Sequence, residues 1–198
     1  MCNSYEHTIV ITNRHLVQGD FLKQLEKVTK LHPHALILRE KDLTDDAYES
    51  LAKKVFDLCE REDITFFLHT KIEIARKIGC QNIHLSIPVL KGLSETEKKA
   101  LTEDFCEISI SCHSMEDVEI AMAGGATQII LGTIFETECK KGVLGKGVEF
   151  VREICQKCPL PVYAIGGMNL QRLPLVIDAG AAGCCMMSGF MQTTKPLQ

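Results

Sequence analysis

The chain lacks an excess of basic charge, a long apolar run and a leader-like start. Its 22 Lys and Arg stand against 26 Asp and Glu, which gives a net charge of −4, so it offers no basic field that could hold a nucleic acid. No apolar run approaches the roughly 20 residues of a membrane helix, and the first residues lack the charged-then-apolar form of a signal peptide. We therefore expect a cytoplasmic protein with no nucleic-acid partner and no membrane partner.

A second Cys-x-x-Cys pair is also missing, although the chain has 10 cysteines. The single pair, Cys155 and Cys158, precedes Pro159, and a structural zinc site of this kind needs a further pair. Most other cysteines are isolated in apolar patterns, where a thiol behaves as a small hydrophobic residue. The cysteines therefore predict no metal site.

What the sequence does contain is a regular alternation of short apolar runs with stretches of helical period. One such stretch places Ala47, Leu51, Val55 and Leu58 on one helix face. Strands and amphipathic helices in strict alternation require a parallel sheet covered by helices, and eight repeats favour closure. We therefore predict an α/β fold, a (β/α)8 TIM barrel formed as one domain by residues 1–198. The expected strands cover residues 8–12, 35–38, 64–68, 82–85, 107–110, 128–131, 162–165 and 183–186.

Helix boundaries follow from local signals. Ser94 and Glu97 have the spacing of a capping box, Asn169 is expected to cap the seventh helix, and Pro174 predicts that this helix is short or kinked. Residues 190–198 are too few for a full last helix, which we expect to be short or missing. An apolar seam would then be exposed there, and a second copy of the chain could cover it as a homodimer.

The residues that follow the strands are cationic, hydroxylic and glycine-rich. In a parallel barrel these positions share one face, and glycines let backbone N–H groups approach phosphate oxygens closely. We therefore expect a small phosphate ester to bind there. The residues concerned are Arg39 and Lys41, His69, Ser111 and His113, Thr133 and Lys140, Gly166 and Gly167, and Ser188 and Gly189.

Histidines supply the candidate acid or base groups, because imidazole titrates near neutral pH. His69 and His113 follow the third and fifth expected strands and could face a ligand, or they could only hydrogen-bond a neighbouring loop. His84 lies inside a strand and could equally point into the packing. The remaining histidines are expected to be exposed bystanders, namely His7, His15, His32 and His34.

Five stretches carry a resemblance to a known family: LREK at 38–41, SCHS at 111–114, GTIFETECKKG at 132–142, AIGGM at 164–168 and MSG at 187–189. Found in this order, they resemble the thiamine phosphate synthase/TenI family over about residues 8–191. Synthases join a pyrimidine pyrophosphate to a thiazole phosphate. The resemblance implies that the groups around the pyrophosphate are Arg39, Lys41, Ser111, Thr137 and Lys140.

The resemblance also shows what has been lost. The family's Mg²⁺ ligands follow the third and fourth strands, where this chain has His69, Thr70 and Ser86. Losing all of the metal's carboxylates should remove most of the synthase rate, because Mg²⁺ neutralises the leaving pyrophosphate. We therefore expect no cofactor, and Mg²⁺ only if the protein is a synthase.

TenI-type tautomerases, which aromatise a thiazole phosphate carboxylate, also lack the metal ligands and resemble this chain better. Their catalytic histidine directly follows the sixth strand, where this chain has Thr133. Either His69 or His113 has taken over, or the catalyst is weak or absent. We expect a tautomerase first, with His113, His69 and Lys140 as catalytic candidates. A thiamine phosphate synthase and a non-catalytic binder of thiazole or thiamine phosphate are the alternatives.

Overall fold

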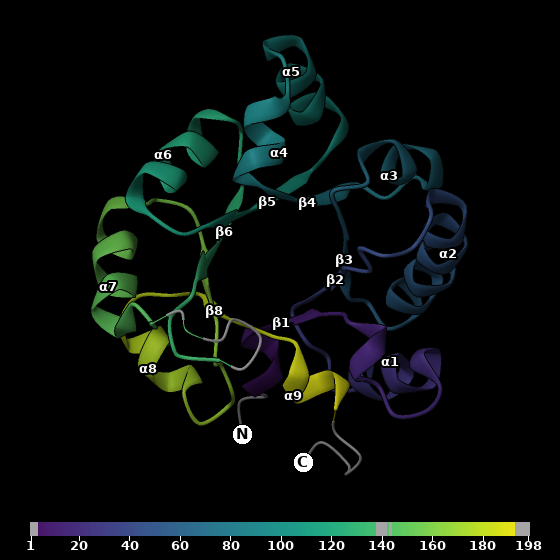
Figure 1. Cartoon of the computed structure of the whole chain (residues 1–198), viewed down its shortest axis with the longest axis horizontal. Coiled ribbons are helices and arrows are strands. Elements are labelled where there is room, and N and C mark those ends of the chain that lie inside the picture. Colours follow the sequence, from purple (N-terminus) through teal and green to yellow (C-terminus); the bar gives the residue numbers. More distant parts are fainter. Residues whose placement is uncertain (1–3, 138–141, 143, 193–198) are drawn as a thin grey trace.

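Eight parallel strands pair in sequence order, and β8 pairs with β1, so that the sheet closes into a barrel (Figure 1). In this computed structural model, which describes residues 4–137, 142 and 144–192, helices separate the strands and surround the barrel. The predicted (β/α)8 barrel is therefore confirmed. The strands are β1 Thr8–Ile11, β2 Ala35–Leu38, β3 Thr65–His69, β4 Asn82–Ser86, β5 Glu107–Cys112, β6 Gln128–Gly132, β7 Val162–Ile165 and β8 Gly183–Met186.

The strands β3 to β6 extend one or two residues beyond the apolar runs that predict them. His69 pairs in register with His84, and Ser86 pairs with Ser111. His69, Ser86 and Ser111, and the glycine at the end of β6, interrupt the hydrophobic signal, while the backbone ladder continues through them. A sequence pattern based on apolarity therefore ends these four strands too early, whereas it ends β1 one residue too late, because Thr12 lies beyond the strand.

The helices form the outer ring of the molecule (Figure 1). No helix among the described residues is both long and apolar enough to span a membrane. The α-helices are α1 Phe21–Thr29, α2 Asp45–Arg61, α3 Ile72–Ile78, α4 Ile87–Gly92, α5 Glu95–Asp104, α6 Met115–Ala123, α7 Gly147–Lys157, α8 Leu173–Asp178 and α9 Ser188–Met191, with short 3-10 helices at Ser4–His7 and Arg14–Leu16.

The buried face of α2 differs from the predicted one. Thr44 caps this helix by accepting a hydrogen bond from the backbone N–H of Ala47, which leaves Ala47 exposed in the first turn. Tyr48 and Ala52 face the core, together with the predicted Val55 and Leu58, and the predicted Leu51 is half-buried against it. The expected face was therefore wrong at its start, because Tyr48 buries a ring that outweighs its one polar atom.

The capping box of Ser94 and Glu97 is confirmed at the start of α5. The expected cap of α8 was wrong. Asn169 Oδ1 accepts from Arg172 N at 2.9 Å in the turn before the helix, whereas α8 itself begins at Leu173 without a side-chain cap. Pro174 lies in the first turn of α8, where a backbone N–H has no partner to lose, and the helix is short, with 6 residues.

The chain itself closes the gap left by a short last helix. The side chains of Phe190 and Met191 in α9 are each 1% exposed. The ring centroids of Phe190 and Tyr5 lie 5.9 Å apart. The backbone carbonyl of Phe190 accepts a 2.7 Å hydrogen bond from Gln24 Nε2. Figure 1 shows α9 beside the N-terminal 3-10 helix, between α8 and α1. Among the described residues α9 therefore fills the position of the expected seam, although Leu175 and Ile177 of the neighbouring α8 are exposed, and a homodimer stays a prediction.

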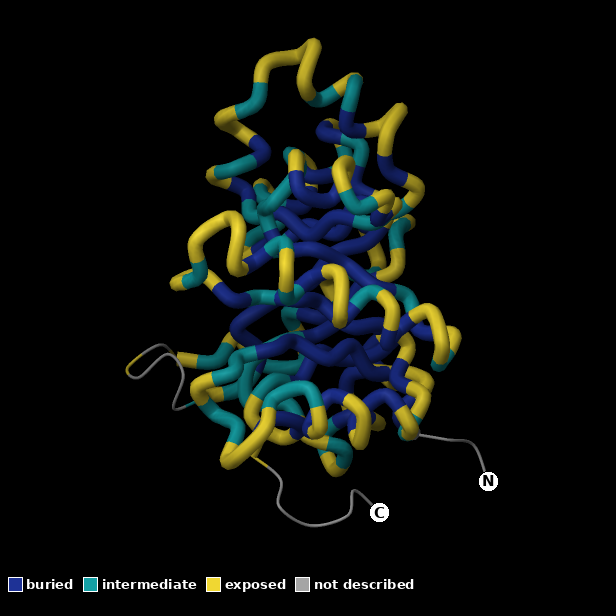
Figure 2. Tube along the Cα trace, turned by 90° about the vertical axis from the view of Figure 1, so that its right-hand side faces the viewer, coloured by how far each residue is buried: buried dark blue, intermediate teal, exposed yellow. Residues whose placement is uncertain are grey.

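The interior of the barrel is apolar on one side and polar on the other. Buried residues run through the centre of the molecule in Figure 2, with exposed residues at the loops. The polar side is formed by the end of β3 and by β4 and β5, which carry His69, His84, Ser109 and Ser111. The apolar side is a cluster that includes Ile9, Ile37, Phe67, Ile130, Tyr163 and Cys185.

Candidate functional site

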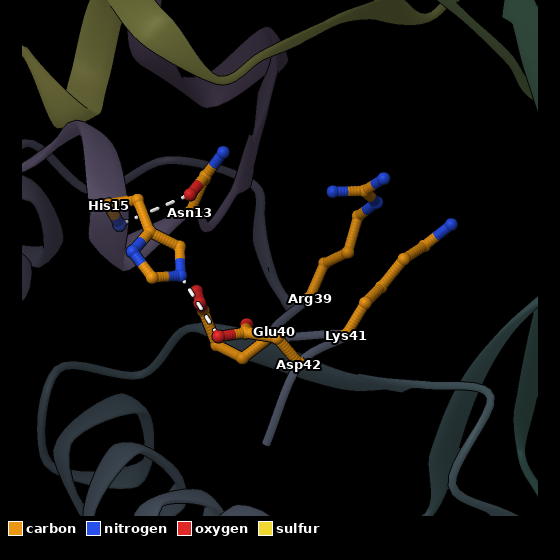
Figure 3. A pocket seen from close by; sticks show the side chains of 6 residues that line it. All are labelled: Asn13, His15, Arg39, Glu40, Lys41 and Asp42. Atoms are coloured by element: carbon orange, nitrogen blue, oxygen red, sulfur yellow. Dashed lines mark hydrogen bonds and ion pairs between the residues drawn. The ribbon is translucent and has the colours of Figure 1, made fainter.

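A pocket of about 220 Å³ opens where β1 and β2 end (Figure 3). Arg39 and Lys41 extend side by side from the turn after β2 in this view. The structure thus brings together the two cations that the sequence predicts. The pocket is lined by Asn13, His15, Arg39, Glu40, Lys41 and Asp42.

Glu40, between the two cations in sequence, is turned away from them and is 2% exposed. Its carboxylate accepts a 2.7 Å hydrogen bond from Thr12 Oγ1 and two 3.1 Å hydrogen bonds from the backbone N–H of Arg14. Thr12 Oγ1 also accepts from Arg39 N at 2.9 Å. These bonds fix the backbone from which Arg39 projects.

Arg14, which follows β1, bridges the two acidic residues of the turn after β2, Glu40 and Asp42. Its Nη1 donates to Glu40 Oε2 at 3.1 Å and to Asp42 Oδ1 at 2.6 Å, and its Nη2 donates to Asp42 Oδ2. His15 Nε2 donates to the same carboxylate at 3.0 Å. Hydrogen bonds from Arg14, and then from His15, hold the pKa of Asp42 well below its usual range. His15 is exposed as expected, but it lines the pocket and is not a bystander.

His84 organises the polar side of the barrel interior. Its Nδ1 lies 2.9 Å from Ser109 Oγ and its Nε2 lies 2.8 Å from Ser111 Oγ. The predicted ligand residue Ser111 is therefore held by a buried imidazole. The ring of His69 stacks on that of His84 with centroids 5.4 Å apart.

Both of these imidazoles are neutral at pH 7. Burial, followed by the charges of Arg39 and Lys41, lowers the pKa of His69 to about 3. Burial, followed by His69 and Arg39, lowers the pKa of His84 to about 3. His69 Nδ1 is buried and has no hydrogen-bond partner in the described part of the chain. A base with so low a pKa removes protons poorly near pH 7.

His113 lies where β5 and β6 end together. Its Nδ1 donates a 2.7 Å hydrogen bond to the carbonyl of Gly132, the last residue of β6. Its backbone N–H donates to Asp117 at 2.7 Å, and its carbonyl accepts from Lys146 Nζ. Because a carbonyl only accepts, Nδ1 is the donor in this bond, and Nε2 is the ring nitrogen left for a ligand.

The turn after β7 packs against the loop after β6. Gly166 and Gly167 have φ values of 102° and 60°, and a Cβ on either would collide with that loop, at Thr133 and at the carbonyl of Glu136 respectively. Thr133 is buried at 6% exposure beneath Gly166. The glycines are thus required by packing. Of the two other predicted residues of this loop, Thr137 is half-buried, and Lys140 lies outside the described residues.

Exposed backbone donors lie after β7 and β8. Ser188 and Gly189 are exposed at the start of α9. In the described segments, the N–H groups of Gly167, Ser188 and Gly189 have no acceptor. Asn13 Nδ2 contacts Met187 Sδ at 3.9 Å, which links the turn after β8 to the pocket at Arg39.

The donor set does not fit a magnesium ion. The strand ends at His69, Thr70 and Ser86 carry no carboxylate, and Mg²⁺ prefers carboxylate oxygens. The two acids that line the pocket, Glu40 and Asp42, are paired with Arg14. Across the residues that the structure places, no group of three His, Cys, Asp or Glu side chains could hold a metal ion.

The sequence and fold match known proteins over almost the whole chain. A family described as thiamine monophosphate synthase matches residues 8–190. A putative thiamine-phosphate synthase 2 of Aquifex aeolicus is 29% identical over 92% of this chain and 96% of its own length. A thiamine-phosphate synthase of Coprothermobacter proteolyticus is 30% identical over 90% of this chain and 84% of its own. The structure of a thiamine phosphate pyrophosphorylase from Pyrococcus furiosus, 22% identical, has the same fold with a TM-score of 0.82, covering 97% of this chain and 90% of that one.

The match to this family spans all eight strands and both glycine turns of the barrel mouth. It agrees with the resemblance that the five sequence stretches indicate. The chain therefore belongs to the thiamine phosphate synthase/TenI family.

Proposed function

We propose that this protein is a TenI-type tautomerase that aromatises a thiazole phosphate carboxylate, with His113 as its acid and base. The single observation that carries this proposal is the 2.7 Å hydrogen bond from His113 Nδ1 to the carbonyl of Gly132. It brings an imidazole from the turn after β5 to the end of β6, next to Thr133, the position at which the family resemblance expects a histidine. This position supports the proposal that His113 takes the role of the histidine that residue 133 lacks.

The chemistry requires a group that takes a proton from one atom of the ligand and returns it to another. Nε2 of His113 accepts the proton from one ligand atom and then donates it to another, while Nδ1 keeps its own proton on the carbonyl of Gly132, so no proton is gained or lost overall. His69 serves this step less well, because its pKa of about 3 makes it a weak base at neutral pH.

The two acidic groups of such a ligand have separate partners in this proposal. The backbone N–H groups of Gly167, Ser188 and Gly189, with Gly166 forming the turn, bind the phosphate. Arg39 binds the carboxylate from the neighbouring pocket, with Lys41 beside it. Lys140, from the loop after β6, is proposed to pair with the carboxylate as well or to shape the pocket.

The test is to incubate the purified protein with the thiazole phosphate carboxylate tautomer and follow formation of the aromatic ring. We expect acceleration over buffer without added divalent cation. His113→Asn keeps a hydrogen-bond donor but no basic nitrogen, and should lower the rate by about 10²–10⁴-fold. His32→Asn is the matched control, because His32 is exposed and has a φ of 51°, which Asn tolerates.

A rate equal to that in buffer refutes the tautomerase, and unchanged activity in His113→Asn refutes the role of His113. Tight ligand binding without turnover would instead favour a non-catalytic binder. A large loss in His69→Asn, with His113→Asn unaffected, would assign the chemistry to the other histidine.

The second candidate is a thiamine phosphate synthase, the activity named for the relatives. Arg39, Lys41 and Ser111 favour it, since the resemblance places these residues around a pyrophosphate. A condensation assay with and without Mg²⁺ separates the two activities. Rapid product formation that depends on Mg²⁺ would overturn the tautomerase proposal, because the donor set described above does not fit that ion.

A further inference from the structure

The turn after β2 alternates positive and negative side chains, Arg39, Glu40, Lys41 and Asp42. A cationic side chain that pairs with a neighbouring carboxylate is less available to bind an anionic ligand. Among the residues the structure places, however, no carboxylate contacts the guanidinium of Arg39. Glu40 and Asp42 therefore form their hydrogen bonds with another residue.

Arg14 holds both of them. It donates through Nη1 to Glu40 and Asp42 at 3.1 and 2.6 Å, and through Nη2 to the second oxygen of Asp42. The Arg14–Asp42 pair is bidentate, which is the strongest common geometry for such a pair. Arg14 comes from a different turn, after β1, and its backbone N–H also binds Glu40.

We propose that Arg14 is a positioning residue that sequesters Glu40 and Asp42 and so leaves Arg39 unpaired for an anionic ligand. This inference rests on the proposed function, in which Arg39 binds an acidic group. Arg14 itself does not contact the ligand. Its effect on binding passes through the two carboxylates, of which Asp42 is exposed and can turn toward the pocket once released.

The consequence of losing Arg14 follows from charge alone. A released Asp42 would pair with Arg39 or Lys41, or face the ligand as a like charge, and either outcome weakens anion binding by about tenfold. Glu40 stays in place, because Thr12 Oγ1 and the backbone N–H of residue 14 still bind it. Removing the charge of Asp42 as well should then restore binding.

The experiment titrates inorganic pyrophosphate into the protein by calorimetry, with the melting temperature of each variant recorded. Arg14→Gln should bind about tenfold more weakly than wild type. Asp42→Asn alone should bind at least as tightly as wild type, and the double variant Arg14→Gln/Asp42→Asn should regain most of the lost affinity. Arg14→Lys, which keeps a cation for Asp42, should lie between wild type and Arg14→Gln.

If Arg14 only stabilises the fold, the result differs. The double variant lacks the Arg14–Asp42 ion pair just as Arg14→Gln does, and it would then bind pyrophosphate as weakly as Arg14→Gln. That result, or wild-type affinity in Arg14→Gln, overturns the inference. Should Arg14→Gln not fold, the same comparison is made with Arg14→Lys and Arg14→Lys/Asp42→Asn. Arg39→Gln tests the role of Arg39 separately from that of Arg14. If this variant binds pyrophosphate as tightly as wild type, or if wild type does not bind pyrophosphate, the role of Arg39 in anion binding is overturned.

Discussion

The stacked pair of His69 and His84 makes the stability of the barrel depend on pH in a defined window. The pKa of each is about 3 in the folded protein, against 6.5 in an unfolded chain. The unfolded state therefore binds more protons between pH 6.5 and 3. The stabilisation is complete above pH 6.5 and is lost progressively as the pH falls toward 3. For one such histidine the loss between pH 7.5 and pH 5 is about 2 kcal/mol.

Urea unfolding at pH 7.5, 6 and 5 measures this loss directly. Carboxylates whose pKa is lowered, such as Glu49 and Glu97, lose their contribution only at more acidic pH and do not interfere. His69→Asn should remove about 2 kcal/mol of the pH-dependent loss, since it takes away one of the two titrating groups.

The exposed His32, changed to Asn, is the control and should leave the pH dependence as in wild type. A free energy of unfolding that stays flat from pH 7.5 to 5, or one that falls equally in His69→Asn and wild type, would refute the buried neutral pair.

Two further outcomes are expected. Tyr48→Phe should lower the free energy of unfolding by about 1–3 kcal/mol. The Tyr48 hydroxyl donates to the carbonyl of Leu38 and accepts from the N–H of His69, and both backbone groups would lose this buried partner. An unchanged urea midpoint would contradict this prediction. Lys140→Ala should weaken binding of the thiazole phosphate carboxylate without changing the melting temperature, and unchanged affinity would show that this lysine does not face the ligand.

The strands were predictable because barrel strands are buried on both faces and appear as short apolar runs. Their polar ends were not. His69 and Ser111 continue the strand ladders but carry no hydrophobic signal, so their place inside the barrel depends on the register of neighbouring strands.

The candidate site was predictable in outline, since all strand ends of a parallel barrel meet at one face. The same argument applied to the first strand would have found Asn13, Arg14 and His15, which directly follow β1. By contrast, no sequence spacing indicates that His113 reaches the carbonyl of Gly132. That contact depends on the conformation of the turn after β5 and on the closure of β5 against β6.

The central claim, that one barrel mouth binds both acidic groups of a phosphorylated thiazole, is tested most directly by a crystal structure with the thiazole phosphate carboxylate bound. We expect phosphate oxygens about 3 Å from the N–H groups of Gly167, Ser188 or Gly189, and the carboxylate at Arg39. A phosphate bound away from the turns after β7 and β8, or a carboxylate that does not approach Arg39, would contradict the account.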